Sequence, residues 1–412
     1  MAKKDRSRLS RRAWITTTSG VIAAGLLKTQ SDAVKLVAQE APSTAQDPTK
    51  VPGRFTSQLG SRAPAEQPVR LVRAEALSSS SRTPLQDLMG IITPADLHFE
   101  RHHGGIPNII HDDHELLVHG MVDRPMVFKM ADLKRYPQTS RIRFLECSGN
   151  GGGAYNRNRM PTEVTPQSLD GLLSTSEWTG VMLSTILREV GVRRGASWIL
   201  AEGGDSAVMS RSVPLEKAMD DSMLAYGQNG EAIRPEQGYP VRLFLPGWEG
   251  NANVKWLRRI EVTDRPTMTR EETSKYTDPL LGGTARQFSF VMDAKSIITF
   301  PSYPYTLPDR GWWEIKGLAW TGRGRITQVD ISTDGGQSWT PAELQGPVFS
   351  KSTVRFRHLW NWDGRETHIL SRATDETGYV QPDLETQIAA RGEGTSYHYN
   401  TIRPWKVEAD GR

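Results

Sequence analysis

Residues 143–153 read Arg-Phe-Leu-Glu-Cys-Ser-Gly-Asn-Gly-Gly-Gly, an apolar run that leads directly into a glycine-rich stretch. The cysteine in it, Cys147, is the only one in the chain of 412 residues. Glycine lets a backbone approach a large ligand closely, and a thiolate is a nucleophile or a soft metal ligand. A buried cysteine that packs as a small hydrophobe is the structural alternative. The segment therefore indicates a loop whose thiol serves either chemistry or packing.

The length of the chain favours two folded domains, because one hydrophobic core seldom grows beyond about 250–300 residues. Residues 115–118, 141–145, 197–201 and 241–245 have the pattern of short strands, and residues 183–190 have that of a helix. Gly and Pro turns join them. This alternation predicts a mixed α+β domain over residues 91–285.

The pattern changes after the polar stretch at residues 267–286. Strands are predicted at residues 311–320, 325–332, 354–360 and 368–373, with turns at the Asp-Gly pairs between them. Regularly spaced antiparallel strands of this kind are typical of a β-sandwich of immunoglobulin type. We therefore predict such a sandwich over residues 286–412.

The N-terminal residues have the pattern of an export signal. Two consecutive arginines, Arg11 and Arg12, precede an apolar run at residues 21–27 that is too short to span a membrane. We therefore expect a twin-arginine signal peptide at residues 1–38 and a periplasmic protein. Residues 39–90 are rich in Ala, Pro, Ser and Gln, which predicts a linker or arm with little regular structure.

The charge balance gives no support to nucleic-acid binding. Residues 1–38 carry eight Lys or Arg against two Asp or Glu, so without them the whole-chain charge of +4 becomes about −2. One cysteine also excludes an internal disulfide, a Cys-x-x-Cys-His haem site and a cysteine-held iron–sulfur cluster. If the protein handles electrons, another chain must accept them.

Four further segments combine an apolar frame with polar residues that have no evident structural purpose: 99–107, 201–206, 238–242 and 254–257. They contain arginines, histidines, an aspartate and a lysine within strand-like surroundings. Buried Lys and Arg are rarely tolerated without a partner. An anionic cofactor with a phosphate and polar ring edges would satisfy them together.

Together with Cys-Ser-Gly-Asn at residues 147–150, Trp-Thr-Gly-Val at 178–181 and Asn-Gly-Glu at 229–231, these segments resemble the sulfite oxidase family of molybdenum enzymes. The resemblance extends over nearly the whole chain after the signal. Residues 320–339 are similar to the family's C-terminal dimerisation domain. The resemblance implies the α+β molybdopterin-binding fold of sulfite oxidase, an immunoglobulin-like dimerisation domain and a molybdenum–molybdopterin cofactor.

The resemblance also implies roles for individual residues. Cys147 corresponds to the protein thiolate that binds molybdenum, which suits a soft ligand. Arg101, Tyr276 and Arg391 correspond to catalytic residues near the metal and the substrate anion. The cofactor-binding set comprises Phe99, Arg101, His103, Cys147, Asp205, Gln237, Arg242 and Lys255. The chain departs from the family pattern at Gly151 and Gly152, where an arginine pair is common, and at Gln237, where a histidine is common.

The glycine pair removes positive charge beside the metal and widens the entrance, which favours sulfur carried on a protein arm over free sulfite. The resemblance is closest to the branch that oxidises sulfane sulfur on a carrier protein during thiosulfate oxidation. It implies that oxygen from water is added to reduced sulfur and that electrons pass to a dihaem c-type cytochrome. A homodimer within a heterotetramer is the expected assembly.

Other functions remain open from the sequence. A sulfite dehydrogenase acting on free sulfite is the nearest, and an exported sulfoxide reductase is more distant because that branch lacks the sandwich. His111, Asp112, Asp113 and His114 suggest part of a zinc site and hence a hydrolase, although their spacing matches no zinc signature. A non-catalytic binding module is the third class.

Overall fold

The computed structural model describes residues 52–154, 164–392 and 397–412. The predicted signal peptide at 1–38 and the first part of the predicted arm lie outside these residues. Residue contacts divide the chain into a unit of residues 1–61 and a compact unit of residues 62–412. The compact unit contains both predicted domains, and the boundary between residues 285 and 286 stays a prediction.

The predicted arm contains more regular structure than expected. Residues 52–70 form no helix or strand, but β1 (Leu71–Arg73) and β2 (Ser80–Arg82) pair with each other, and β2 pairs with β3 (Glu100–Arg101). This three-stranded sheet requires β3, which lies about 20 residues further along the chain. Local composition could not reveal it, because the hydrogen bonds of a strand depend on its partner.

The first of two five-stranded sheets positions the cysteine loop. Its order is β11-β10-β7-β6, with β12 also paired to β10. The strands are β6 (Gln138–Glu146), β7 (Leu173–Met182), β10 (Met223–Gln228), β11 (Glu231–Ala232) and β12 (Arg242–Phe244). Every pairing is antiparallel. Because β6 ends at Glu146, Cys147 lies immediately beyond a strand end, at the edge of the sheet.

The second five-stranded sheet has the order β5-β4-β13-β8-β9. Its strands are β4 (Glu115–Gly120), β5 (Met126–Lys129), β8 (Trp198–Gly203), β9 (Ser210–Pro214) and β13 (Leu257–Thr263). The β13–β4 pair is parallel, and the other pairs are antiparallel. Lys255 and Trp256 directly precede β13, so this sheet brings a second group of polar residues to the site.

The main core of the α+β part includes both sheets and α3 (Leu183–Val190). Leu183, Ile186, Leu187 and Val190 recur at helical spacing and are fully buried, so the helix presents one apolar face to the core. It ends at Gly191, whose backbone is left-handed with φ 71°. The short helices α1 (Met130–Leu133) and α4 (Leu215–Asp220) contribute further residues to the same core.

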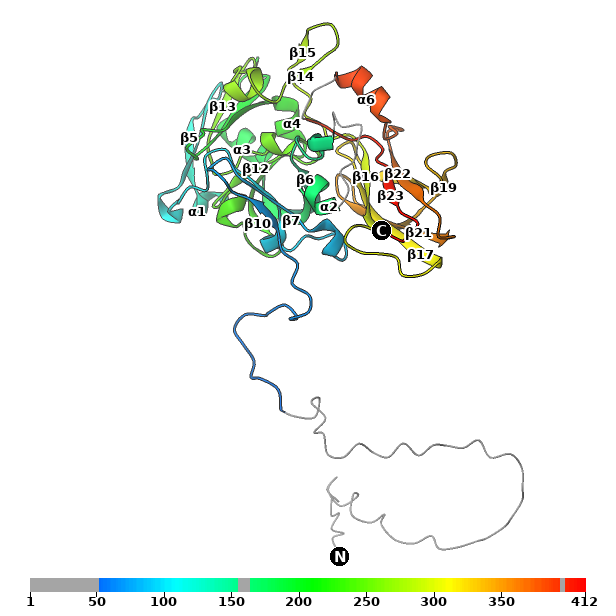
Figure 1. Ribbon diagram of the computed structural model, residues 1–412. Coiled ribbons are helices and arrows are strands. Elements are labelled where there is room, and N and C mark those ends of the chain that lie inside the picture. Colours follow the sequence, from blue (N-terminus) through cyan, green and yellow to red (C-terminus); the bar gives the residue numbers. More distant parts are fainter. Residues whose placement is uncertain (1–51, 155–163, 393–396) are drawn as a thin grey trace, which may run out of the picture. The chain divides into compact units, whose positions relative to one another are not determined.

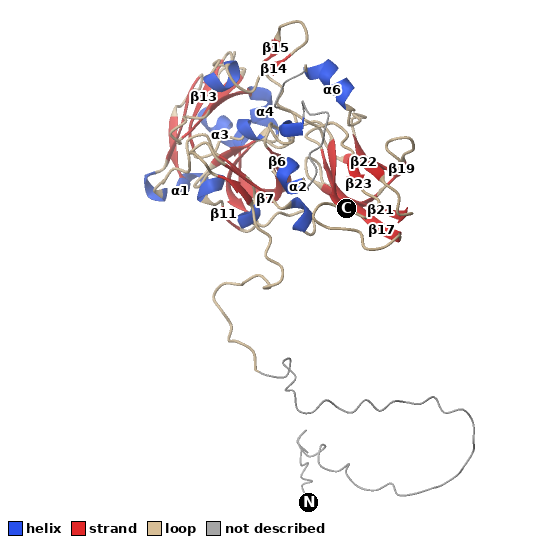
Figure 2. Cartoon of the chain, in the orientation of Figure 1, coloured by secondary structure: helices blue, strands red, loops and turns tan. Residues whose placement is uncertain are grey.

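The C-terminal part is a sandwich of two four-stranded sheets, whose strands are coloured yellow to red in Figure 1 and red, like all strands, in Figure 2. One sheet has the order β16-β17-β21-β20, with β16 (Lys295–Phe300), β17 (Gly311–Trp320), β20 (Glu343–Gln345) and β21 (Val354–Trp362). The other has the order β19-β18-β22-β23, with β18 (Ile326–Ser332), β19 (Thr340–Pro341), β22 (Thr367–Asp375) and β23 (Trp405–Val407). The predicted α+β fold followed by a sandwich is confirmed.

The sandwich packs on the α+β part through a small apolar cluster. Phe144 of β6 and Leu173 of β7 share this cluster with Ile297, Leu318 and Trp320 of the sandwich. The remaining elements are α2 (Pro166–Asp170), α5 (Arg270–Thr273), α6 (Leu384–Arg391), β14 (Asp278–Pro279) and β15 (Ala285–Arg286). Within the described residues, every helix is too short or too polar to traverse a lipid bilayer.

Candidate functional site

A pocket lies where the ends of the two five-stranded sheets meet. It brings together all but one of the residues predicted from the sequence: Phe99, Arg101, His103, Cys147, Asp205, Gln237, Arg242, Lys255 and Tyr276. These residues come from segments separated by up to about 180 positions in the sequence. Their convergence on one cavity indicates a common ligand.

Cys147 is held by the backbone on both sides. Its N–H donates to the carbonyl of Leu172 (3.0 Å), and its carbonyl accepts from the N–H of Asn150 (2.8 Å). The side chain is buried and lines the pocket. Burial raises the pKa of the Cys147 thiol, against the lowering effects of the Gly149 backbone and the charge of Arg101. Binding a metal at this sulfur must therefore release a proton.

Arg242 is a buried cation that opens β12. Its guanidinium donates to the carbonyls of Gln237 (2.9 Å) and Asn253 (3.1 Å) and lies over the ring of Trp178, and its Nε has no hydrogen-bond partner among the described residues. Burial lowers the pKa of this guanidinium to about 9. In the described part of the chain it forms no ion pair with a carboxylate, so an anion is needed to neutralise it.

Lys255 is the second cation at the pocket. Its ammonium group donates to the carbonyls of Arg101 (3.2 Å) and Glu236 (2.9 Å) and lies 2.9 Å from Nδ1 of His102. Burial, assisted by the charge of Arg242, lowers the pKa of Lys255 well below its ordinary value. Like Arg242, it forms no carboxylate ion pair within the described ranges. Two such cations on one cavity indicate a site for an anion such as phosphate.

His103 and Tyr276 form a hydrogen-bonded pair at the pocket, with 2.8 Å between Nε2 and the hydroxyl oxygen. Burial and the charge of Arg101 lower the pKa of His103 to about 4, whereas burial raises the pKa of Tyr276. Both groups are therefore neutral near pH 7. Tyr276 also has a left-handed backbone with φ 51°, a conformation that costs a non-glycine residue of order 1–3 kcal/mol and is concentrated at functional sites.

The remaining predicted residues shape the pocket wall. Gln237 donates from Nε2 to the carbonyl of Phe99 (2.9 Å), and Asp205 accepts the N–H of Met209 (3.1 Å). Gly238, with φ 109°, follows Gln237, and a Cβ there would lie 3.0 Å from the Cβ of Lys255. Glycine is therefore required for both conformation and space at this position.

The residues present fit a molybdopterin. The pocket offers one thiol, which suits a soft metal, and two cations without carboxylate partners, which suit a phosphate. Asp205 and the carbonyl and N–H groups of the wall can bind the polar edges of a pterin. The unpartnered Nε of Arg242 is a further donor available to a ligand.

Arg391 is the predicted residue that lies outside the pocket lining. It ends α6, and its guanidinium is held by Asp278 (2.9 Å) and Asp293 (2.9 Å), with a weaker contact to the Ser289 hydroxyl. Sequence reasoning had no means of identifying these two carboxylates. The proposed contact of Arg391 with a substrate anion stays a prediction.

Several pocket residues were not predicted. His102 accepts from Lys255 and is bonded through Nε2 to Glu100 (2.8 Å). Asn251 donates to the hydroxyl of Ser148 (3.0 Å), beside the metal-ligand candidate, and its own Oδ1 has no partner. The polar run Gly-Asn-Ala-Asn at residues 250–253, between two apolar segments, was the available signal.

The histidine-rich segment does not assemble a metal site. His111 is bonded to exposed Asp112, and Nε2 of buried His114 is bonded to the carbonyl of Leu257 (3.1 Å). Across the described ranges, no three His, Cys, Asp or Glu side chains gather closely enough to hold a metal ion. The contacts that these histidines make are those of a turn and a strand edge.

Comparisons with known proteins agree with the chemistry of the pocket. Residues 103–271 match the oxidoreductase molybdopterin binding domain, and residues 286–404 match the Mo-co oxidoreductase dimerisation domain. The fold and site thus define a molybdopterin-dependent oxidoreductase. The chain belongs to the sulfite oxidase family of molybdenum enzymes.

Among solved structures, the chain is similar to the sulfane dehydrogenase SoxCD from Paracoccus pantotrophus. The two share 42% sequence identity with a TM-score of 0.81, over 88% of this chain and 96% of that one. The resemblance within the family that the sequence indicated is thereby confirmed.

Nitrate reductases form a second group of relatives. The NADH enzyme of Cichorium intybus is 32% identical over 74% of this chain and 37% of its own length. That of Ulva prolifera is 28% identical over 81% of this chain and 43% of its own length. The chain thus spans less than half the length of these relatives.

Proposed function

We propose that this protein is the molybdenum-binding component of an exported dehydrogenase that adds water-derived oxygen to reduced sulfur, with sulfane sulfur on a carrier protein as substrate. The observation that carries the proposal is the unique thiol of Cys147 on a pocket with two cations that form no carboxylate ion pair in the part of the chain that the structure describes. The similarity to a sulfane dehydrogenase over nearly the full length of both chains supports the choice of substrate.

Cys147 would bind the molybdenum, and Arg242 and Lys255 would neutralise the phosphate of the pterin. When bound, the cofactor supplies two-electron oxygen-atom transfer between water and sulfur. Phe99, Gln237 and Asp205 form the wall that orients it, with His103 on the side of Tyr276. Neutralising the two cations makes cofactor binding favourable, because each is buried or partly buried without an acidic partner.

Arg101 and Tyr276 would act on the substrate. Arg101 lines the pocket and presents a permanent positive charge, which attracts an anionic sulfur group. Tyr276 stays protonated because burial raises the pKa of its hydroxyl, so it can donate a hydrogen bond to an oxygen of the substrate. His103 holds that hydroxyl in place from the other side.

Arg391 would reach the substrate only by exchanging the carboxylates that now hold it. Both sides of its guanidinium are occupied, by Asp278 and Asp293. We keep it as a candidate that binds the substrate anion when the anion replaces one carboxylate.

Two glycines favour a substrate larger than free sulfite. Gly151 and Gly152 follow the cysteine turn, and neither adds a cation that could hold a small dianion. A sulfur atom that arrives on a carrier arm needs fewer cations around it than free sulfite does. Oxidation of free sulfite is the second candidate, favoured by the presence of Arg101 in the same pocket.

The electrons would leave to a c-type cytochrome, because the sequence has no cysteines for haem attachment or an iron–sulfur cluster. The match to a dimerisation domain supports a homodimer. A heterotetramer that also contains the cytochrome subunit is the assembly that this electron transfer would need. The paired arginines at residues 11–12 support twin-arginine export to the periplasm.

The deciding experiment measures turnover of the purified holoenzyme with a c-type cytochrome, using carrier-bound sulfane and free sulfite in parallel. We expect strong reduction of cytochrome with the carrier substrate and weak reduction with sulfite. Turnover of free sulfite alone would overturn the choice of substrate. Full molybdenum content and activity in Cys147→Ser would overturn the role of the thiol. Gel filtration tests the homodimer, which a monomeric mass would contradict.

A further inference from the structure

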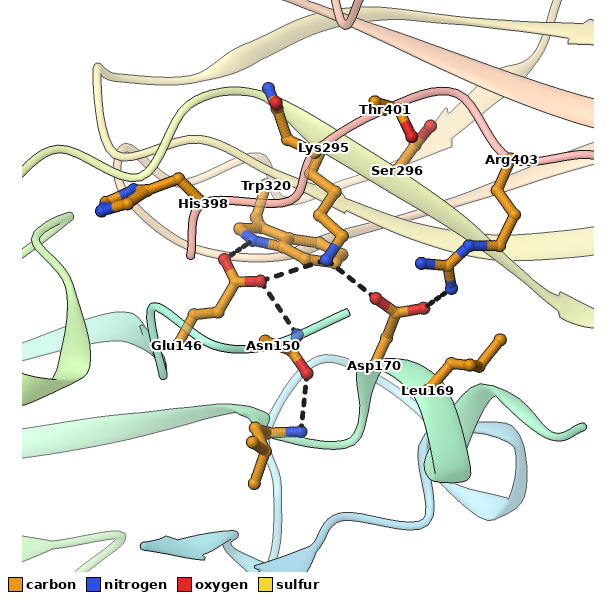
Figure 3. A network of polar contacts seen from close by, with 12 residues as sticks. Glu146, Asn150, Leu169, Asp170, Lys295, Ser296, Trp320, His398, Thr401 and Arg403 are labelled. Carbon is orange, nitrogen blue, oxygen red and sulfur yellow. Dashed lines mark hydrogen bonds and ion pairs between the residues drawn. The ribbon is translucent and has the colours of Figure 1, made fainter. Parts of the chain in front are cut away.

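A buried network of charges joins the sandwich to the cysteine loop (Figure 3). Glu146, the residue before Cys147, accepts hydrogen bonds from Trp320 (Nε1 to Oε2, 2.6 Å) and Asn150 (Nδ2 to Oε1, 2.9 Å). The ammonium group of Lys295 lies 3.4 Å from Oε1 of Glu146. Lys295 opens β16 and pairs across the sheet with Trp320 of β17. The contacts of Lys295 and Trp320 with the Glu146 carboxylate therefore come from the first two strands of the sandwich.

Lys295 also reaches a second carboxylate. Its ammonium group lies 2.8 Å from Oδ1 of Asp170, which ends α2, and Arg403 binds the other oxygen of Asp170. All four charged side chains are buried, and two carboxylates balance two cations. Removing one member leaves an uncompensated buried charge, which is much more costly than losing an exposed pair.

The network holds the loop that carries Cys147 at two points. Glu146 is covalently adjacent to Cys147, and Asn150 closes the turn that follows it. Asn150 also accepts the N–H of Leu172 through Oδ1 (3.0 Å), and Leu172 in turn accepts the N–H of Cys147 (3.0 Å). A displacement of the Glu146 carboxylate would therefore move both ends of the turn.

Gly151 makes room for this arrangement. A Cβ at Gly151 would lie 3.0 Å from Oδ1 of Asp170 and 3.1 Å from the ammonium group of Lys295. Its backbone φ of +76° also disfavours other residues. The glycine after the cysteine turn thus has a structural reason in the network itself.

We propose that Lys295 and Trp320 of the sandwich are positioning residues that set the place of the Cys147 sulfur. The inference rests on the proposed role of Cys147 as the metal ligand. It gives the sandwich a task within each chain, separate from association between chains: its first two strands fix the loop from which the thiol reaches the pocket.

The test uses the single cysteine of the chain as its own reporter. The full-length protein is produced without cofactor, and the rate of Cys147 alkylation by iodoacetamide is measured for wild type, Lys295→Met and Lys295→Arg. We expect Lys295→Met to accelerate alkylation about tenfold or more, because local opening exposes the thiol. Lys295→Arg retains the charge and should restore a rate near that of wild type.

Lys217→Met is the matched control. Lys217 is also a buried lysine, pairs with Asp221 and lies over a tryptophan ring, Trp248, at 5.3 Å, compared with 5.5 Å for Lys295 over Trp320. Among the described residues, the polar contacts of its ammonium group are with Asp221 and the carbonyl of Pro246, outside residues 146–150. We expect the alkylation rate of Lys217→Met to stay within about twofold of wild type. This should hold even if its unfolding midpoint falls as far as that of Lys295→Met.

A second readout uses the loaded enzyme. The Mo(V) electron paramagnetic resonance spectrum reports the position of the thiolate, so we expect it to change in Lys295→Met and to be unchanged in Lys217→Met. Equal alkylation rates in the two methionine variants, together with identical spectra, would overturn the proposal.

If Lys295→Met does not fold, Glu146→Gln with Lys295→Met takes its place, because this pair leaves Asp170 balanced by Arg403. Accelerated alkylation in the double variant supports the proposal, and a wild-type rate overturns it. The proposed function is judged separately by the molybdenum content of Cys147→Ser. If Cys147→Ser loses molybdenum while the Lys295 variants keep the alkylation rate and the spectrum of wild type, only the positioning role is contradicted.

Discussion

His103 and Tyr276 lie on the pocket with 2.8 Å between the imidazole Nε2 and the phenol oxygen, although 173 positions separate them in the chain. Burial keeps both groups neutral near pH 7, by lowering the pKa of His103 to about 4 and raising that of Tyr276. The pair can therefore direct a hydrogen bond without carrying a charge. Such a preorganised donor is valuable where charge develops during a reaction.

Tyr276→Phe removes the donor and keeps the ring. We expect kcat to fall by roughly 100-fold, the size of effect seen when one preorganised hydrogen-bond donor is lost. Molybdenum content should stay at the wild-type level, because the hydroxyl does not bind the cofactor in this proposal. Steady-state kinetics with a cytochrome acceptor, combined with elemental analysis, checks this. An unchanged kcat would remove Tyr276 from the catalytic set.

Arg242→Met should have opposite effects on the cofactor-free and loaded forms. Replacing a buried cation that lacks a carboxylate partner by an apolar residue should leave the free energy of unfolding of the cofactor-free chain unchanged or raise it by about 1 kcal/mol. The same variant should retain little molybdenum, because it cannot neutralise the phosphate. Chemical denaturation and metal analysis measure the two effects. A cofactor-free form destabilised by several kcal/mol would contradict this prediction.

Gly250→Ala should disturb the metal ligand. A Cβ at Gly250 would lie 2.9 Å from the carbonyl oxygen of Glu146 and 3.2 Å from the Cα of Cys147, so the loop must shift. We expect molybdenum content to fall at least severalfold. Gly153→Ala is the control, since a Cβ at Gly153 meets nothing within 4 Å. Equal metal contents in the two variants would show that the close approach at Gly250 is dispensable.

His98 should make the stability of the protein depend on pH. It is fully buried, donates from Nδ1 to the carbonyl of Phe99 (2.9 Å), and burial lowers its pKa to about 3. The unfolded chain binds this proton near pH 6.5, so His98 removes stability as the pH falls from about 6.5 towards 3. Between pH 6.5 and 5, the free energy of unfolding of His98→Asn should fall by about 1.6 kcal/mol less than that of wild type.

Denaturation curves of both proteins at several pH values test this prediction. The free energy of unfolding of wild type should fall steadily relative to that of His98→Asn as the pH falls. Parallel curves would mean that the folded protein protonates His98 as readily as the unfolded chain does.

Local patterns in the sequence predicted the regular elements well. The helix expected at residues 183–190 and the strand expected at 311–320 are α3 (Leu183–Val190) and β17 (Gly311–Trp320). Both have a periodicity that is visible within one element. The strands β1 and β2 were not predicted, because their pairing depends on a partner further along the chain.

The site likewise contains residues that the local sequence could indicate and contacts between distant segments that it could not. Residue types and family resemblance identified many of the pocket residues, because a thiol and several cations in apolar surroundings indicate a ligand whatever their contacts with one another. The partners of Arg391 and of Glu146 could not be predicted in this way. Glu146 and Lys295 are 149 positions apart, and nothing in either segment indicates the other. Buried ion pairs of this kind become visible only when the strands are assembled.

The charge network also constrains when the protein can become active during its synthesis. Asp170 needs Arg403, which lies 233 positions further along the chain, and Glu146 needs Lys295, which lies 149 positions further along. Synthesis must therefore pass residue 403 before the thiol loop can acquire its final support. Cofactor insertion should be a late maturation step, and shortened products that end before Arg403 should remain immature.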